Sequence, residues 1–154
     1  MSGNGARQRG GRWNPPGFST VYGRTTDATA LEECKANDRY YGIETKGPRL
    51  LVAIEADLKR MLDLIQPNLR RALNLTLEEL AAEAWRKLLA AGRESLTQVL
   101  GRAVADAGGS GLLARSAAVK QGVNVVIFRG VCHGDRLEVV EGDKLATLSV
   151  KTKI

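Results

Sequence analysis

The sequence predicts a single α+β domain, in which mixed or antiparallel sheets are flanked by helices on one side. Segments with strand character stand at both ends of the chain and enclose a helical middle, an order unlike the regular alternation of parallel α/β folds. The chain has 154 residues, a length that suits one domain with one core. Its 44% hydrophobic and 26% charged residues are typical of a globular domain.

The first third of the chain is predicted to form a strand, a helix and a second strand. Residues 19–22 are short, β-branched and aromatic, as expected of a strand. Asp27 can cap a helix whose apolar residues recur at helical spacing and which ends near Gly42. The nearly continuous apolar run at residues 49–55 predicts a central strand covered on both faces. Residues 61–65 are predicted to form a short strand or a helical turn.

A long amphipathic helix is predicted next. Thr76 and Glu79 form a capping-box pattern, and the apolar residues that follow lie on one face of a helix that Gly92 ends. Trp85 lies on this apolar face, so we expect it to be buried in the core.

The last part of the chain changes from helical to strand periodicity. A second amphipathic helix is predicted to begin at residues 94–95 and to end at the glycine pair 108–109. Four strands are then predicted, at residues 112–113, 123–128, 136–140 and 146–150.

Several classes of site lack their sequence signals. Cys34 and Cys132 are far apart and form no C-x-x-C pair, so the sequence predicts neither a disulfide scaffold nor a thiolate metal site. His133 is the only histidine, which argues against a zinc enzyme and a Ser-His-Asp triad. No P-loop or complete dinucleotide fingerprint is present. No apolar run is long enough to cross a membrane, so we expect a cytoplasmic protein without a metal or a membrane partner.

The net charge of +6 is concentrated near the N-terminus. Four arginines precede the first acidic residue, Asp27; they are Arg7, Arg9, Arg12 and Arg24. Such a cluster attracts phosphates of nucleic acid or of a nucleotide, or an acidic partner. Residues 1–9 are glycine-rich as well as basic, and we expect them to form a partly disordered arm ahead of a domain at residues 10–154.

Residues 10–17 read Gly-Gly-Arg-Trp-Asn-Pro-Pro-Gly. Glycines allow backbone angles that other residues avoid, and prolines restrict the chain that follows. The segment is therefore interpreted as a rigid, irregular loop that presents Arg12 and Trp13, with a plain surface turn as the alternative.

This loop is followed by Val21 and Tyr22, by Ala-Leu-Glu-Glu at residues 30–33, by Gly-Leu-Leu-Ala-Arg-Ser-Ala at residues 111–117 and by Asn-Val-Val at residues 124–126. The set and its order resemble the RES domain, a family named for its Arg, Glu and Ser. The resemblance implies a fold similar to the ADP-ribosyltransferases. It also implies a toxin of a bacterial toxin-antitoxin pair that acts on NAD+, either cleaving the nicotinamide-ribose bond or transferring ADP-ribose to a protein. NAD+ is then the substrate, no cofactor is expected, and phosphate is a possible co-substrate.

The resemblance also implies roles for individual residues. The family's acidic residue lies eleven positions after the motif tyrosine, which selects Glu33 over Glu32. Glu33 would stabilise the positive charge that develops on the ribose, and Ser116 would position Glu33 or the ribose. Arg12 would bind the diphosphate, and Tyr22 would stack on the nicotinamide.

Two further expectations concern partners. The family's toxins are neutralised by an antitoxin with an Xre-like helix-turn-helix region, whose C-terminal segment plugs the active site; a basic N-terminus would suit an acidic plug. RES domains usually carry another arginine well before the Gly-Gly-Arg-Trp-Asn loop, whereas here eleven residues precede Arg12. The alternative function is therefore a basic, non-catalytic module for nucleic acid or a protein, with a degenerate active site. Direct binding to nucleic acid is the less favoured of these expectations.

Overall fold

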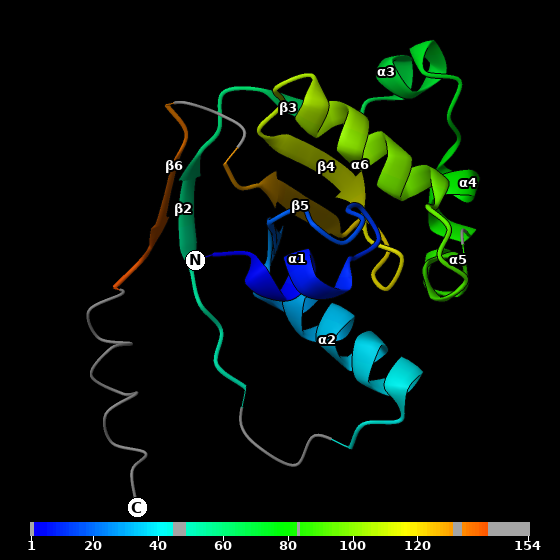
Figure 1. The fold of residues 1–154 in the computed structure, drawn as a ribbon. Helices are drawn as coiled ribbons and strands as arrows, with labels where there is room; N and C mark the ends of the chain where they lie inside the picture. The colour runs from blue at the N-terminus through cyan, green and yellow to red at the C-terminus, as the bar shows by residue number, and fades with distance from the viewer. Residues whose placement is uncertain (1, 45–48, 83, 131–133, 142–154) are drawn as a thin grey trace, which may run out of the picture.

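The structure is a computed structural model that describes residues 2–44, 49–82, 84–130 and 134–141. Its larger sheet is mixed and has four strands in the order β1 (Thr20–Arg24), β5 (Val123–Phe128), β4 (Gly111–Arg115) and β3 (Met61–Asp63). Only β3 and β4 run parallel within it. A second, antiparallel sheet pairs β2 (Ile54–Asp57) with β6 (Arg136–Val139), apart from the first (Figure 1). The predicted α+β class with a mixed sheet is confirmed.

The described part of the chain has six helices: α1 (Asn4–Arg9), α2 (Asp27–Tyr41), α3 (Pro67–Ala72), α4 (Leu77–Ala82), α5 (Trp85–Ala90) and α6 (Leu96–Asp106). Helix α6 packs on β4, and α1 and α2 pack against β1 (Figure 1). Helices α4 and α5 lie beside α6, across from the far end of α2. Residues of α2, α4 and α5 line a common cleft.

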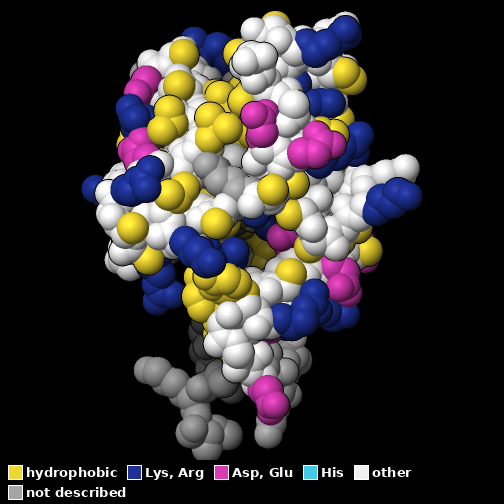
Figure 2. Space-filling view, turned by 90° about the vertical axis from the view of Figure 1, so that its right-hand side faces the viewer, with side chains coloured by type: hydrophobic (Ala, Val, Ile, Leu, Met, Phe, Trp, Pro, Cys, Tyr) yellow, Lys and Arg dark blue, Asp and Glu magenta, His cyan; other side chains and the backbone are white. Residues whose placement is uncertain are grey.

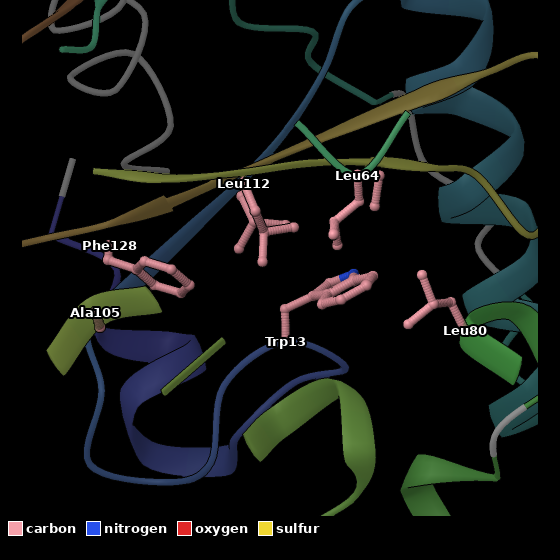
Figure 3. Packing of buried hydrophobic residues seen from close by; sticks show 8 residues of the cluster. Trp13, Leu64, Leu80, Ala105, Leu112 and Phe128 are labelled. Atoms are coloured by element: carbon pink, nitrogen blue, oxygen red, sulfur yellow. The ribbon is translucent and has the colours of Figure 1, made fainter. Parts of the chain in front are cut away.

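The core lies between α6, the sheet and the loop at residues 10–17. Trp13 is at its centre, only 3% exposed, with Leu64, Leu80 and Leu112 packed around its ring (Figure 3). The loop comes so close to α6 that a Cβ placed on Gly101 would lie 1.8 Å from the Trp13 carbonyl oxygen. Burial of Trp13 therefore fixes the loop, and Arg12 with it, between a helix and the sheet.

The ends of the two longest helices follow from their sequences. Thr26, not the expected Asp27, caps α2 by accepting a hydrogen bond from the Thr29 amide, and Gly42 ends the helix with φ of 63°. Ser95 caps α6 in a complete capping box with Gln98. The Thr26 cap fixes where α2 begins, and the Ser95 cap fixes where α6 begins.

The apolar run at residues 49–55 is not a central strand, contrary to the prediction. Leu50 and Leu51 are 66% and 47% exposed, and pairing begins only at Ile54, in the two-stranded sheet. The central positions of the larger sheet are filled by β4 and β5, whose side chains are largely buried. An unbroken apolar run does not specify whether other elements will cover it.

The predicted helix from Thr76 to Gly92 is divided into α4 and α5. Ala84 leaves the helical region with φ of −79° and ψ of 53°, which separates the two short helices. Leu80 reaches the core, whereas Trp85 is half-buried and lies on the open space beside α2. The expectation that Trp85 belongs to the core is therefore wrong.

The N-terminal segment also differs from the expected arm, because residues 4–9 form helix α1. The Asn14 side-chain amide donates to the Ala6 carbonyl at 3.0 Å, and the Gly17 amide donates to the Arg7 carbonyl at 2.7 Å. These bonds join the helix to the loop at residues 10–17. The predicted strand at residues 146–150, Cys132 and His133 lie outside the described residues.

Candidate functional site

The loop at residues 10–17 is held by a network of buried hydrogen bonds. The Tyr22 hydroxyl donates to Asn14 Oδ1 at 2.7 Å and accepts from the Trp13 amide at 3.0 Å. Gln98 Nε2, on α6, donates to the Gly11 and Asn14 carbonyls at 2.9 and 3.3 Å. These bonds tie the loop to β1 and α6.

Tyr22 is the centre of this network. Burial of its hydroxyl raises the pKa far above the ordinary 10.0, although its hydrogen bond with Trp13 and the charges of Arg24 and Arg12 oppose the shift. The phenol consequently stays protonated and donating at every physiological pH. The Tyr22 hydroxyl is engaged in hydrogen bonds with the loop, so the ring is the part of Tyr22 that can contact a ligand in the adjacent open space.

Arg12 reaches from the loop to α4. Its Nη1 donates to the Leu80 carbonyl at 2.8 Å and to the Ala81 carbonyl at 3.4 Å. These carbonyls belong to the last turn of a helix, where backbone acceptors lack intrahelical partners. Arg12 therefore connects the loop to the end of α4, while still lining the same open space.

Glu33 is the centre of a second cluster. Its Oε1 accepts hydrogen bonds from Ser116 Oγ at 2.6 Å and from Asn124 Nδ2 at 3.1 Å. Arg24 Nη2 lies 3.8 Å from its Oε2. The Glu33 side chain remains 20% exposed, so one carboxylate is held by three side chains and still reaches solvent.

The sheet explains why these residues meet. Arg24 and Asn124 are directly paired across β1 and β5, so their side chains emerge on the same face. Asn124 is also paired with Ala114 of β4, two residues before Ser116. Helix α2 lies over this end of the sheet and brings Glu33 onto it (Figure 1).

Two polar atoms of the cluster are buried without a hydrogen-bond partner among the described residues: Arg24 Nε and Asn124 Oδ1. A buried donor or acceptor left unpaired costs about 1–3 kcal/mol. The two atoms have complementary roles, since the first can only donate and the second can only accept. Such a pair suits a ligand group that both accepts and donates hydrogen bonds.

The cluster opens on a cleft of about 2240 Å³ between α2 and the α4–α5 pair. Figure 2 shows this face hollowed, with hydrophobic and basic side chains around the opening. Among the described residues, three acidic side chains and six arginines line the cleft; the arginines are Arg9, Arg12, Arg24, Arg49, Arg86 and Arg115. Small-molecule sites occupy about 300–1,000 Å³, so the cleft is large enough for a dinucleotide and its charge suits phosphates.

The profile of the RES domain family matches residues 1–147 of the chain. The chain belongs to the RES domain family. Its fold is similar to that of a chain in the crystal structure of the M. tuberculosis MbcT-MbcA toxin-antitoxin complex, with a TM-score of 0.67 and 23% sequence identity over 92% of this chain and 74% of the other. No curated protein matches the sequence significantly.

In this RES domain the two adjacent glutamates of α2 lie in different surroundings. Glu33 enters the cluster, whereas Glu32 points outward, 44% exposed, and pairs with Lys35 at 2.7 Å. The hydrogen bond and charge of Lys35 lower the pKa of Glu32. A helical offset of about 100° per residue produces this difference.

The structure brings together some of the predicted site residues more closely than others. Glu33 and Ser116 are in direct contact, and Tyr22 and Arg12 line the same cleft. Arg24 and Asn124 were not assigned roles from the sequence. Arg24 lies beyond the predicted strand at residues 19–22 and shares the face of Tyr22 only because β1 continues to Arg24. The position of Asn124 beside Glu33 could not be inferred without the register between β4 and β5.

The described residues include neither a candidate metal-binding group nor a helix that could span a membrane. They contain no group of three His, Cys, Asp or Glu side chains that could hold a metal ion. None of their helices combines the length and the apolar character required to cross a bilayer.

Proposed function

We propose that this RES domain is the toxin of a bacterial toxin-antitoxin pair and that it consumes NAD+ by breaking the bond between nicotinamide and ribose. The observation that carries the proposal is the Glu33 carboxylate, held by Ser116 and Asn124 on the wall of a large basic cleft. Family membership and the likeness in fold to a chain of a toxin-antitoxin complex support the same conclusion.

Glu33 would act on the charge that appears during the reaction. When the C–N bond to nicotinamide breaks, its electron pair leaves with the pyridine ring and positive charge develops on the ribose. A carboxylate fixed beside the ribose stabilises that charge without having to reorient. The acceptor oxygen, from water, phosphate or a protein side chain, then bonds to the ribose carbon and releases a proton. Water gives ADP-ribose, phosphate gives its phosphorylated form, and a protein acceptor gives a labelled protein.

Ser116 would act by positioning Glu33. Its Oγ donates to Glu33 and also accepts hydrogen bonds from the Ala118 and Val119 amides, both at 3.1 Å. A hydroxyl has one proton and two lone pairs, so all three are already engaged. An oxygen with both lone pairs occupied is a poor nucleophile, which favours the positioning role.

Arg24 and Asn124 would complete the nicotinamide end of the site. The unpaired Arg24 Nε can donate to a carbonyl, and the unpaired Asn124 Oδ1 can accept from an amide N–H. A primary carboxamide presents that combination, and small movements of the two side chains on substrate entry would supply the missing bonds. The ring of Tyr22 would stack on the pyridine, and Arg12, with the other arginines of the cleft, would bind the diphosphate.

The proposed partner is an antitoxin of the Xre-like type, whose acidic segment would enter the arginine-lined cleft. Consumption of NAD+ would place the toxin in the cytoplasm, where its substrate is found.

The deciding experiment incubates the purified protein with NAD+, with and without phosphate, and separates the products. We expect nicotinamide release by the wild type and a loss of about 100-fold or more in Glu33→Gln. Glu32→Gln is the matched control, because it makes the same chemical change one residue away on the exposed side of α2. The proposal fails if the wild type releases no nicotinamide under either condition. Salt-dependent binding to duplex DNA by such an inactive protein would instead favour a basic binding module.

A further inference from the structure

An arginine is stacked among three aromatic rings at the rim of the cleft, far from Glu33. The Arg86 guanidinium carbon lies 4.3 Å from the ring centre of Tyr40, 4.4 Å from that of Trp85 and 5.7 Å from that of Tyr41. The two tyrosine rings meet edge to face at 4.9 Å. We call these four residues the aromatic cluster.

The aromatic cluster joins the two walls of the cleft. Tyr40 and Tyr41 are in the last turn of α2, and Trp85 and Arg86 begin α5. Arg86 Nη2 also donates to Asn37 Oδ1 of α2 at 3.1 Å.

The aromatic cluster and Glu33 lie along one stripe of α2. Glu33, Asn37 and Tyr40 are separated by four and three residues, so all three share a face of the helix. All three line the cleft. Seven residues of helix correspond to about 10.5 Å, which separates the aromatic cluster from the proposed site of bond cleavage along one continuous wall.

The aromatic cluster has features of a site for a planar ring. Both tyrosines are 56% exposed, although large apolar rings gain most from being covered. Leu50, Leu51 and Val52 are also exposed and line the same cleft. Arg86 Nε is buried without an acceptor among the described residues, so this N–H group can still donate a hydrogen bond to a ligand. Stacking surfaces, apolar neighbours and a spare donor are what a purine base can use.

We propose that the aromatic cluster binds the adenine base of NAD+, at the end of the cleft opposite the nicotinamide. This inference rests on the proposed function for the identity of the whole substrate. The base stacks on the exposed tyrosine rings beside Arg86, and a small movement of the Arg86 side chain lets its buried Nε donate to a ring nitrogen. The diphosphate then spans the cleft between the aromatic cluster and Glu33, past the arginines that line it.

The test measures the binding of adenosine monophosphate by calorimetry and the steady-state kinetics with NAD+. In Tyr40→Leu and in Arg86→Met we expect the Kd for adenosine monophosphate to rise about tenfold. The KM for NAD+ should rise by a similar factor while kcat stays within about twofold, because the reacting bond is remote. Arg102→Met is the matched control, since Arg102 is an exposed arginine paired with Glu94 outside the cleft. Tyr40→Leu alters an exposed ring and keeps the test valid if Arg86→Met fails to fold.

The outcomes separate this inference from the proposed function. If the wild type binds adenosine monophosphate and the two variants bind it weakly, the adenine subsite stands even where no nicotinamide is released. If the wild type cleaves NAD+ but the variants keep wild-type Kd and KM values, the subsite is wrong and the proposed function survives. Failure of the wild type to bind adenosine monophosphate would also overturn the subsite.

Discussion

Ser116 Oγ donates a 2.6 Å hydrogen bond to Glu33 Oε1, across 83 residues of sequence. The bond joins the loop after β4 to the middle of α2. It fixes one oxygen of the carboxylate and leaves the other, Oε2, near Arg24. Several predictions about activity and stability depend on this arrangement and on the loop at residues 10–17.

Ser116→Ala should slow NAD+ cleavage about tenfold while leaving the fold intact. The substitution removes one positioning hydrogen bond from the charged Glu33 carboxylate, worth about 1.5 kcal/mol. Steady-state kinetics should show the change mainly in kcat. Thr76→Ala is a suitable control, because it removes the cap at the start of α4, a comparable loss of stability, outside the cleft. An equal loss of activity in both variants would mean that stability, and not position, is responsible.

Asn124→Leu should lower activity at little net cost in stability. Asn124 is 8% exposed and its Oδ1 has no partner among the described residues, so an apolar side chain of similar size removes an unpaired buried acceptor, which offsets the lost hydrogen bond from Nδ2 to Glu33. We expect the free energy of unfolding in denaturant to stay within about 1 kcal/mol of the wild type, and cleavage to fall at least tenfold.

Asn14→Leu provides the contrast. Asn14 is 1% exposed, donates to the carbonyls of Ala6, Pro15 and Phe18, and accepts from Tyr22. Its loss leaves several buried groups unpaired and should cost about 3 kcal/mol or more. Similar stabilities for the two leucine variants would contradict this explanation of the unpaired Asn124 oxygen.

Stability should depend on Tyr22 at alkaline pH. Burial raises the folded-state pKa of Tyr22 well above 10.0, so the stabilising hydrogen bonds are fully present below pH 10. Above that pH the unfolded chain releases the tyrosine proton and the folded chain does not. The free energy of unfolding should then fall by up to about 1.4 kcal/mol per pH unit. In Tyr22→Phe this component should disappear, and stability at neutral pH should drop by about 1–3 kcal/mol. Thermal unfolding between pH 8 and about pH 11 checks both effects; parallel curves for the two proteins would refute the assignment.

Gly101→Ala should be strongly destabilising. The added Cβ would meet the Trp13 carbonyl oxygen at 1.8 Å and force α6 away from the loop, at a cost of about 3 kcal/mol or more. Gly5→Ala is the control, because a Cβ there has nothing within 4 Å and alanine favours the helix. Denaturant unfolding should place the two variants on opposite sides of the wild type.

Much of the fold could be predicted where local sequence signals agree with the tertiary environment. β5 matches the predicted residues 123–128, and α6 begins after the expected Ser95. The predictions for residues 49–55 and for a continuous helix through Trp85 were wrong. In both cases apolar residues that read as core line an open cleft. Periodicity reports which residues share a face, but it does not report what covers that face.

Only part of the candidate site could be predicted from the sequence. The motif selected Glu33 and Ser116, and these side chains are in contact. The roles of Arg12 and Tyr22 in binding substrate stay predictions, because Arg12 Nη1 and the Tyr22 hydroxyl are engaged with the protein itself. Asn124 and the aromatic cluster depend on contacts across strands and helices that no spacing along the chain encodes.

The sequence by itself determined the RES family and the α+β class, and its motif spacing selected Glu33 over Glu32 as the candidate carboxylate. The family follows from the order and spacing of the motifs, and the class follows from local hydrophobic periodicity. Only the tertiary structure decided that Arg24 and Asn124 surround Glu33 and that Arg86 stacks between two helices. Those contacts depend on strand register and helix placement, which are set by packing of the whole core around Trp13.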